Sequence, residues 1–371
     1  MTTAARPAGR SHFPGPHPDA GAPAPRPAPP APAVPRPARV ALLGASGYSG
    51  LEFARLALAH PGLTLAALVS REHAGRPGTD LLPGHAGGGA LPAVVAPEAV
   101  EGLLAAGDAD TVVACLPHGA WAALVEAQPR LESLPGRVID LSADRRDGSR
   151  GYVYGLPEAD RAAVASAARV ANPGCYPTAA ALALLPALAA GWVRGPVFVG
   201  ALSGASGAGR GAALRTSFVE LDGGAALYRA GSEHPHAREM ERSFTRLGEA
   251  PCRVSFAPQL VPMARGILLT AHAPLSHPVS PGEAHHAYCE RYAAEPFVRV
   301  LDPGAWPETR AVRGSNRCDV AVTTLHGGET LLAAAAIDNL VKGAAGQALQ
   351  NLNLLLGWPE TTALPAHGSP W

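Results

Sequence analysis

The chain has 371 residues, 47% of them hydrophobic, so it is long enough for two domains and can bury substantial cores. Its 30 basic and 30 acidic residues give a formal net charge of zero, which excludes a whole-chain attraction to nucleic acid or to an anionic membrane surface. We therefore expect a small-molecule partner.

Residues 1–37 differ from the rest in composition, because they hold twelve of the 38 prolines among many alanines. This stretch predicts a disordered tail. It lacks the apolar core of a secretory signal, although Arg6, Arg10 and Ser11 leave a transit-like role open. No later apolar run predicts a transmembrane helix, so we expect a soluble, cytoplasmic protein.

The cysteines are odd in number, widely spaced and never part of a C-x-x-C pair. This pattern argues against a disulfide framework and against a structural zinc site, so no metal is expected. Lys342 is the only lysine, which leaves little room for Schiff-base chemistry or a P-loop. The five cysteines are Cys115, Cys175, Cys252, Cys289 and Cys318.

The first segment after the tail predicts a strand at residues 40–43, a helix at 51–59 and a strand at 63–69. The turn between the first strand and the helix contains Gly44, Gly47 and Gly50. Missing side chains let the backbone approach a pyrophosphate, and the free amides of the helix start bind it. The segment indicates a dinucleotide site, against the alternative of a tight turn that binds nothing.

Ser70 and Arg71 follow the second strand, where NAD-binding proteins usually present an acid to the ribose hydroxyls. A hydroxyl and a guanidinium suit a 2'-phosphate instead, so the sequence favours NADP. Glu72 leaves the alternative open, because a shift of one or two residues places an acid there.

Two further apolar strands are predicted at residues 111–116 and 137–141, each followed by polar residues. Residues beyond the carboxyl ends of parallel strands line the ligand crevice. His118, Ser142, Asp144 and Arg146 are therefore candidates for the site, with ordinary loop polarity as the alternative.

Cys175 lies in "NPGCYPT", before a helix predicted at residues 178–188. Pro177 suits a first helical position. A free thiol is only a few per cent thiolate at neutral pH, and making the thiolate dominant needs roughly 2.7 kcal/mol. A helix terminus supplies at most about 2 kcal/mol, so Cys175 needs a partner, for which a histidine is the best candidate.

His234 and His236 form an H-x-H pair flanked by Glu233 and Glu239. Residues two apart point the same way in an extended chain, so one histidine can face the thiol while the other contacts an anion. Acid–base chemistry is favoured over a surface loop and over metal binding, for which a third ligand at useful spacing is missing.

The stretch "GALSGASGAGR" places Ser203, Ser206 and Arg210 in a glycine-rich setting after a strand at residues 197–199. Amides, hydroxyls and a guanidinium are what a phosphate or carboxylate requires. Arg265 is predicted at the start of another strand, without an obvious partner in the sequence. The alternative interpretation of either arginine is an ordinary solvated surface charge.

The carboxyl-terminal stretch has an apolar helical stripe at residues 340, 344, 348, 352 and 355, with Gly343 and Gly346 permitting close backbone approach. A helix this apolar must pack on a large surface, and the nucleotide domain is one candidate.

Taken in order, these segments resemble the semialdehyde dehydrogenase family, in its arginine-biosynthesis branch that acts on an acyl phosphate. The matching blocks run from residue 44 to residue 351: "GASGYSG", "CLPHG", "DLSADRR", "YGLPE", "NPGCYPT", "SGASGAGR", "LVPMARGIL", "VRGSN" and "IDNLVKGAAGQALQN". The resemblance implies an α/β fold, with a Rossmann-type parallel-sheet nucleotide domain and an inserted α+β catalytic and dimerisation domain. The boundaries it suggests are a tail at 1–37, an NADP-binding domain at 38–176, an α+β domain at 177–337 and a returning helix at 338–371.

The resemblance also implies NADPH-dependent reduction of N-acetyl-L-glutamyl 5-phosphate to the 5-semialdehyde by a homodimer or homotetramer. Cys175 is the implied nucleophile, because a thioester accepts hydride better than a carboxylate does. His236 is the preferred acid–base group and His234 the alternate. The predicted cofactor contacts are Gly44, Ser46, Gly47, Tyr48, Ser49, Gly50, Ser70, Arg71, Pro117, Ser206, Gly207 and Asn339, and the predicted substrate contacts are His118, Ser142, Arg146, Asn172, Ser203, Arg210 and Arg265.

Two departures from the family pattern bear on the substrate. The family usually has H-R-H-T-P-E where this chain has residues 234–239 as H-P-H-A-R-E, and a histidine where this chain has Gln259. A relative acting on aspartyl phosphate or a carrier-linked aminoadipyl phosphate is therefore the alternative enzyme. An NADP-binding regulatory protein is the non-enzymatic alternative, disfavoured because Cys175 and both histidines are present.

Overall fold

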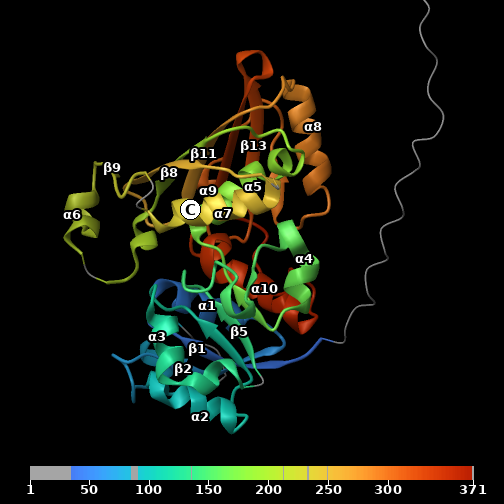
Figure 1. Ribbon diagram of the computed structural model, residues 1–371. Coiled ribbons are helices and arrows are strands. Elements are labelled where there is room, and N and C mark those ends of the chain that lie inside the picture. The colour runs from blue at the N-terminus through green and yellow to red at the C-terminus, as the bar shows by residue number, and fades with distance from the viewer. Residues whose placement is uncertain are drawn as a thin grey trace, which may run out of the picture. The chain divides into compact units, whose positions relative to one another are not determined.

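The computed structural model describes residues 35–84, 91–134, 136–211, 213–231, 234–248 and 250–369. Most of the predicted tail and Glu233 therefore lie outside the described residues. Of the last three tail residues, Arg36 donates its backbone N–H to Leu356 O at 3.0 Å. Two seven-stranded sheets organise the described chain, one below and one above in Figure 1.

The first sheet is parallel throughout, with strand order β3-β2-β1-β4-β5-β7-β6. Its strands are short apolar runs because helices cover both faces, which leaves little need for alternation. The predicted strands at 40–43 and 63–69 are confirmed. The bounds are β1 (Ala38–Leu43), β2 (Leu63–Val69), β3 (Val94–Val95), β4 (Thr111–Ala114), β5 (Arg137–Asp140), β6 (Val153–Tyr154) and β7 (Arg169–Ala171).

The order in which strands are added to this sheet changes direction at β1. Strand β2 pairs with one side of β1, and β4 pairs with the other. In parallel sheets the crevice beyond the carboxyl ends of two such strands is the ligand site. Gly44 follows β1 and Cys115 follows β4, so the glycine loop lies at this crevice.

Two helical layers cover the first sheet. On one side, α1 packs with the carboxyl-terminal helix α10, whose Ala348, Leu349 and Leu352 share a buried core with Val40 of β1. On the other side, Trp121 of α3 and Val100 of α2 form the second core. The helices are α1 (Tyr48–Leu58), α2 (Val100–Ala105), α3 (Ala120–Ala127), α4 (Pro157–Ser166) and α10 (Gly346–Leu356).

The second sheet is mixed and mostly antiparallel, in the order β12-β13-β14-β11-β8-β10-β9. Burial alternates along β8, β10 and β11, because α5 and α7 cover only one face. The predicted α/β fold class is confirmed. The bounds are β8 (Val197–Ser203), β9 (Ala226–Leu227), β10 (Val254–Leu260), β11 (Ile267–Pro274), β12 (Val298–Val300), β13 (Cys318–Leu325) and β14 (Thr330–Ile337), with helices α5 (Cys175–Ala189), α6 (Phe218–Leu221), α7 (Pro235–Gly248), α8 (Pro281–Tyr292) and α9 (Thr309–Val312).

Helix α5 begins three residues earlier than the expected residue 178. Gly174 is its extended N-cap, so Cys175 is the first helical residue and Pro177 the third. Proline is tolerated there because the first-turn amides have no acceptor within the helix. Every residue from Tyr176 to Leu188 is buried, because α5 packs on β11, β13 and β14 of the second sheet and against α7 (Figure 1).

The carboxyl-terminal segment starts with a π-helical turn, Val341–Ala345, before α10. The predicted close approach at the two glycines is confirmed. A Cβ on Gly343 would lie 2.7 Å from Cβ of Cys175, and one on Gly346 would lie 2.4 Å from Oδ1 of Asn316. The turn is therefore packed directly against the head of α5.

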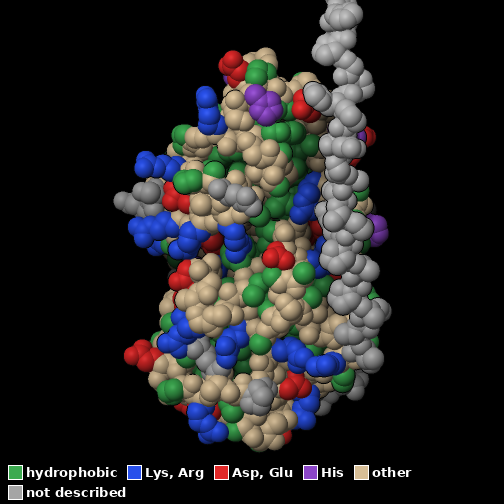
Figure 2. All heavy atoms as spheres, turned by 45° about the vertical axis from the view of Figure 1, so that its right-hand side comes forward, with side chains coloured by type: hydrophobic (Ala, Val, Ile, Leu, Met, Phe, Trp, Pro, Cys, Tyr) green, Lys and Arg blue, Asp and Glu red, His purple; other side chains and the backbone are tan. Residues whose placement is uncertain are grey.

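Among the described residues, none of the helices is both long and apolar enough to cross a membrane. On the face shown in Figure 2, basic side chains have acidic ones beside them and do not form a single basic surface. This distribution matches the zero formal net charge of the chain.

Candidate active site

The glycine loop after β1 is shaped by contacts between backbone atoms. Gly44 has a φ of +72°, and a Cβ there would lie 2.2 Å from Cys115 O. A Cβ on Gly50 would lie 2.2 Å from Gly44 O. Gly47 is the N-cap of α1, whose first amides have no partner within the helix. The loop thus forms a backbone cradle of the kind that accepts a pyrophosphate.

The residues predicted to contact the cofactor ribose line one cavity of about 650 Å³. Ser46 and Ser70 hydroxyls lie 3.1 Å apart, and Ser70 Oγ is 3.3 Å from His73 Nδ1. Arg71 also lines this cavity, and its guanidinium forms an exposed ion pair with Glu98 at 2.8 Å. Because Glu72 lines the same cavity, both the cation and the acid considered for cofactor choice are at this site.

Cys175 connects two further cavities. One, of about 570 Å³, also contains the glycine loop, Pro117, Asn172 and Asn339. The other, of about 410 Å³, contains His234, His236 and Tyr228. The thiol therefore lines a cavity on each of two sides. Residues shared by both cavities are His118, Cys175, Gly207, Ala208 and His236.

Close packing brings His236 next to the head of α5. A Cβ on Gly174 would lie 2.5 Å from His236 Nε2 and 2.9 Å from an Arg146 nitrogen. His236 Nδ1 is buried and has no hydrogen-bond partner among the described residues. The rings of His234 and His236 lie 4.9 Å apart, so both predicted histidines belong to the site.

Burial shifts the pKa values of the thiol and of both histidines. Burial raises the pKa of the Cys175 thiol to about 11, although the Tyr176 amide and the Arg146 guanidinium act to lower it. Burial, followed by the Arg146 charge, holds the pKa of His236 well below its usual range. Burial also lowers the pKa of His234 to about 4. These shifts favour a thiol beside neutral imidazoles in the free protein.

Neutral histidines still suit the chemistry. An unprotonated ring nitrogen accepts a proton, and a group whose pKa lies below neutrality is available as a base at pH 7. His118 accepts the Ala143 N–H through Nδ1 at 3.0 Å, and burial lowers its pKa as well. The site thus contains three histidines and one thiol, with proton acceptors in place.

Arg146 and Glu239 form a buried ion pair beneath the thiol, 2.8 Å apart and each at most 4% exposed. Glu239 Oε1 also accepts the Tyr154 hydroxyl and the Gly174 N–H, both at 2.9 Å. The other guanidinium nitrogens of Arg146 donate to Asn172 O and Leu141 O. The pair therefore fixes the loop that presents Cys175.

The sequence indicates Glu239 only as a neighbour of the histidines and Tyr154 only as part of a family block. Glu239 contacts Arg146, which is 93 residues away in the sequence, and Tyr154, which is 85 residues away. The available signal was the spacing in H-x-H-x-x-E, which places the acid one helical turn after His236.

Three residues predicted for the site, Ser142, Asn172 and Asp144, bind neighbouring groups of the protein. Ser142 is fully buried and donates to Asp140 Oδ2 at 2.9 Å; it lines neither cavity that contains Cys175. Asn172 is buried as well, and its amide group bonds Asn351 and Ala344 O. Asp144 accepts the backbone N–H groups of Gly119 and Ala122, so it orders the loop that contains His118.

The glycine-rich loop after β8 connects the two halves of the site. Asn339 Nδ2 donates to Ser206 Oγ at 3.0 Å, and Arg210 donates to Ser46 O at 2.9 Å. Ser203 is buried and donates to Gly204 O at 3.1 Å. Ser206, Gly207 and Arg210 line the cavity that contains Cys175 and the glycine loop.

Arg265 lies apart from the thiol. Its guanidinium is 3.2 Å from Glu52 and 3.3 Å from Asp338, two partners that are distant in the sequence. It lines a separate cavity of about 1040 Å³ and neither cavity that contains Cys175. The structure thus does not bring this predicted substrate contact to the thiol.

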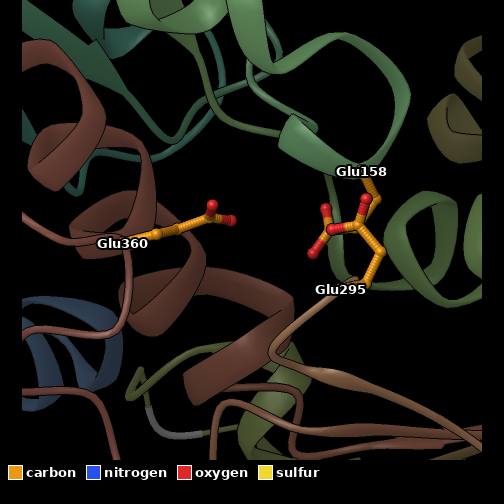
Figure 3. A group of neighbouring side chains, drawn as sticks. All are labelled: Glu158, Glu295 and Glu360. Carbon is orange, nitrogen blue, oxygen red and sulfur yellow. The ribbon is translucent and has the colours of Figure 1, made fainter. Parts of the chain in front are cut away.

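Three carboxylates, Glu158, Glu295 and Glu360, come together (Figure 3), with ligand oxygens within 4.8 Å of one another, and none of them lines a cavity that contains Cys175. Arg161 pairs with Glu295 at 2.5 Å and with Glu360 at 2.7 Å. Lys342 is fully buried and pairs with Glu158 at 2.6 Å, and Arg291 lies 3.5 Å from Glu295. Three cations therefore balance the three carboxylates, and the group forms an ion-pair network.

A nucleotide-binding parallel sheet, a second mixed sheet and a cysteine at their shared cavity define a two-domain dehydrogenase. The model for the NAD-binding domain of semialdehyde dehydrogenases matches residues 39–167, and the model for their dimerisation domain matches residues 175–339. Solved structures share the fold: the aspartate semialdehyde dehydrogenase II of Vibrio cholerae complexed with ASA has a TM-score of 0.69 at 17% identity, covering 86% of this chain and 98% of that one. An aspartate semialdehyde dehydrogenase from Candida albicans with NADP has a TM-score of 0.61 at 16% identity, with coverages of 86% and 98%.

Curated relatives are much more similar in sequence. N-acetyl-gamma-glutamyl-phosphate reductase of Geobacter sulfurreducens is 40% identical, covering 88% of this chain and 97% of the relative. The reductases of Moorella thermoacetica and Thermus thermophilus are 41% and 43% identical, each covering 89% of this chain and 99% of the relative. The chain belongs to the N-acetyl-gamma-glutamyl-phosphate reductases of the semialdehyde dehydrogenase family, and it is an enzyme.

Proposed function

We propose that this enzyme reduces N-acetyl-L-glutamyl 5-phosphate to N-acetyl-L-glutamate 5-semialdehyde with NADPH, through a thioester on Cys175. The observation that carries the proposal is the position of Cys175, the first residue of α5, in a cavity shared with the glycine loop. The family relatives carry the name of this activity.

The residues around the glycine loop fit a dinucleotide. The cradle left by Gly44 and Gly50 has no room for a Cβ, and the free amides of α1 suit the pyrophosphate. Ser70 and Arg71 are the proposed contacts for a 2'-phosphate, which supports NADP over NAD. When bound, the cofactor supplies the hydride. The full set of proposed cofactor contacts is Gly44, Ser46, Gly47, Tyr48, Ser49, Gly50, Ser70, Arg71, Pro117, Ser206, Gly207 and Asn339.

The first chemical step uses the thiol and a neutral histidine. As the substrate carbonyl carbon approaches, His236 takes the proton of Cys175, and the C–S bond forms while the bond to the phosphate oxygen breaks. Phosphate leaves with its electron pair. Because burial keeps the free thiol protonated, this proton transfer must accompany attack, which makes the histidine essential at neutral pH.

Reduction of the thioester, for which a bound nicotinamide cofactor would supply the hydride, would give a hemithioacetal oxyanion. This oxyanion would expel the Cys175 sulfur as the carbonyl reforms and the aldehyde is released. The proton held on His236 returns to the departing sulfur, so the thiol is regenerated. The positive Arg146 guanidinium and the amide at the head of α5 stabilise negative charge at the sulfur and oxygen in both steps. His234 is the alternate proton acceptor, since it lines the same cavity. The proposed substrate contacts remain His118, Ser142, Arg146, Asn172, Ser203, Arg210 and Arg265. Of these, His118, Arg146, Asn172 and Arg210 line a cavity that contains Cys175.

We also propose a homodimer or homotetramer in the cytoplasm. The match to a dimerisation domain supports assembly. All five cysteines are free in the structure, which agrees with a reducing compartment.

A kinetic assay tests the proposal. Purified protein is supplied with NADPH or NADH and with N-acetyl-glutamyl phosphate, aspartyl phosphate or carrier-linked aminoadipyl phosphate, and nicotinamide absorbance is followed. We expect the highest kcat/KM for N-acetyl-glutamyl phosphate with NADPH. Cys175→Ala is expected to lower kcat by at least about 10^4-fold while NADPH still binds. A preference for another acyl phosphate would overturn the substrate, and unchanged turnover in Cys175→Ala would overturn the thioester.

A further inference from the structure

Residues 209–231, called the arm here, form an excursion that contains α6 and β9. None of the residues that the structure describes in the arm is buried. Leu214 is 77% exposed, and Phe218 and Val219 are each 81% exposed. Figure 1 shows α6 projecting away from both sheets. Three large apolar side chains in water at one place indicate a contact surface, because soluble proteins seldom expose such a group without a partner.

The opposite side of the arm forms part of the active site. Arg215 and Thr216 line the cavity of about 410 Å³ that contains Cys175 and His236. Arg215 donates to Leu227 O at 2.6 Å, and its guanidinium lies 5.8 Å from the Tyr228 ring. The arm thus forms one wall of the cavity in which we place the acyl chain.

The arm has little support from its own chain. Its α6 has four residues, too few for a helix that is stable without packing, and β9 has two. Thr216 and Arg210 also line the cavity of about 1040 Å³, so the arm spans open space on that side. Fixing such a segment in one conformation costs about 1 to 2 kcal/mol per residue, which packing from outside must offset.

We propose that a second copy of this chain covers the apolar side of the arm, and that the Arg215 wall of the substrate cavity is complete only in this assembly. The arm lies within the residues matched by the dimerisation-domain model, and it ends at β9, the edge strand of the second sheet. Exposed Phe198 and Leu227, at 47% and 59%, extend the apolar surface onto strands of that sheet.

The charges of the arm also suit a second copy. A two-fold interface places the same patch opposite itself, so the patch must be self-complementary. Both signs of charge occur in the arm, because exposed Glu220 and Asp222 flank the apolar residues and exposed Arg215 and Arg229 line its cavity side. An apolar centre with a mixed polar rim is typical of specific protein interfaces.

The test uses the full-length enzyme with Phe218→Asp, and Trp306→Asp as the matched control. Trp306 is 49% exposed in the loop between β12 and α9, outside the arm. Oligomer mass is measured by analytical ultracentrifugation across protein concentrations, and kcat/KM is measured at the same concentrations. NADPH binding shows that each variant is folded, and Val219→Asp is the second variant if Phe218→Asp does not bind NADPH.

We expect the arm variant to raise the dissociation constant of the oligomer by about 30-fold, as loss of a central aromatic anchor does. Its kcat/KM should fall about tenfold where the monomer dominates and recover on concentration, while Trp306→Asp behaves as wild type. An unchanged oligomer overturns the interface, and a fully active monomer overturns the completed site. The role of the Arg215 wall rests on the proposed function, whereas the measured oligomer mass does not. If the enzyme does not reduce the acyl phosphate but Phe218→Asp still dissociates the oligomer, the proposed function fails and the interface stands.

Discussion

The two sides of Cys175 are built in different ways. On the nucleotide side, backbone atoms set the geometry: Gly44 and Gly50 approach other main-chain atoms so closely that no side chain fits. On the acyl side, buried side chains set it, with Arg146, Glu239 and the histidines held by contacts among themselves. A backbone cradle can be recognised from local glycine spacing, whereas a side-chain cluster depends on residues that only the folded chain brings together.

The largest effect expected on the side-chain side comes from the two histidines. His236→Asn should lower kcat by about 10^2- to 10^4-fold, because it removes the proposed proton acceptor next to Cys175. His234→Asn is the matched control, with the same substitution on a neighbouring ring, and should lower kcat by less. Single-turnover kinetics with NADPH and N-acetyl-glutamyl phosphate measure both. A larger loss in the His234 variant would reverse the assignment.

On the backbone side, two glycines in one loop separate folding from binding. Gly44→Ala should destabilise the fold by at least about 2 kcal/mol, since its φ of +72° is unfavourable for alanine and its Cβ would meet Cys115 O. Gly47→Ala has a φ of −79° and its nearest contact at 3.4 Å, so the fold should tolerate it better. Its methyl group would still enter the phosphate cradle and raise the Kd for NADPH about tenfold.

Urea unfolding and NADPH titration distinguish the two glycine variants. If Gly47→Ala bound NADPH as wild type does while Gly44→Ala folded normally, the close backbone approach would not be what shapes this side of the site.

A further effect expected is a pH dependence at the junction of the two sides. Burial raises the pKa of Asp140, at the end of β5, to about 6 from 3.8. Between these values the folded protein keeps a proton that the unfolded chain has lost. Stability should therefore fall as pH rises through this window, by at most about 1.4 kcal/mol per pH unit. Asp140→Asn should remove this component, as measured by denaturant unfolding from pH 4 to pH 7.

Local patterns were sufficient for much of the fold. The strand, glycine turn and helix after residue 38 were predictable because each has a short-range cause: an apolar run, a missing side chain or a helical repeat. The sequence predicts the start of α5 three residues too late, because Pro177 suits a first helical position whereas the extended Gly174 is the cap.

Long-range contacts limited the prediction of the site. Arg265 was expected at the substrate, but Glu52 and Asp338 neutralise it, and neither is near it in the sequence. The pKa of Cys175 depends on burial, which spacing along the chain does not encode, and burial raises it. Tyr154 and Glu239 meet because α7 packs against the loop before Cys175, and this contact joins segments that are far apart in the sequence.

The buried pair between Lys342 and Glu158 has a practical consequence. Lys342 is the only lysine in the chain and its side chain is fully buried. The folded enzyme therefore offers no lysine amine to acylating dyes, to glutaraldehyde or to enzymes that acetylate or ubiquitinate lysine. Labelling by such reagents at Lys342 would report unfolding of the carboxyl-terminal segment, which makes this one amine a chemical probe of the native state.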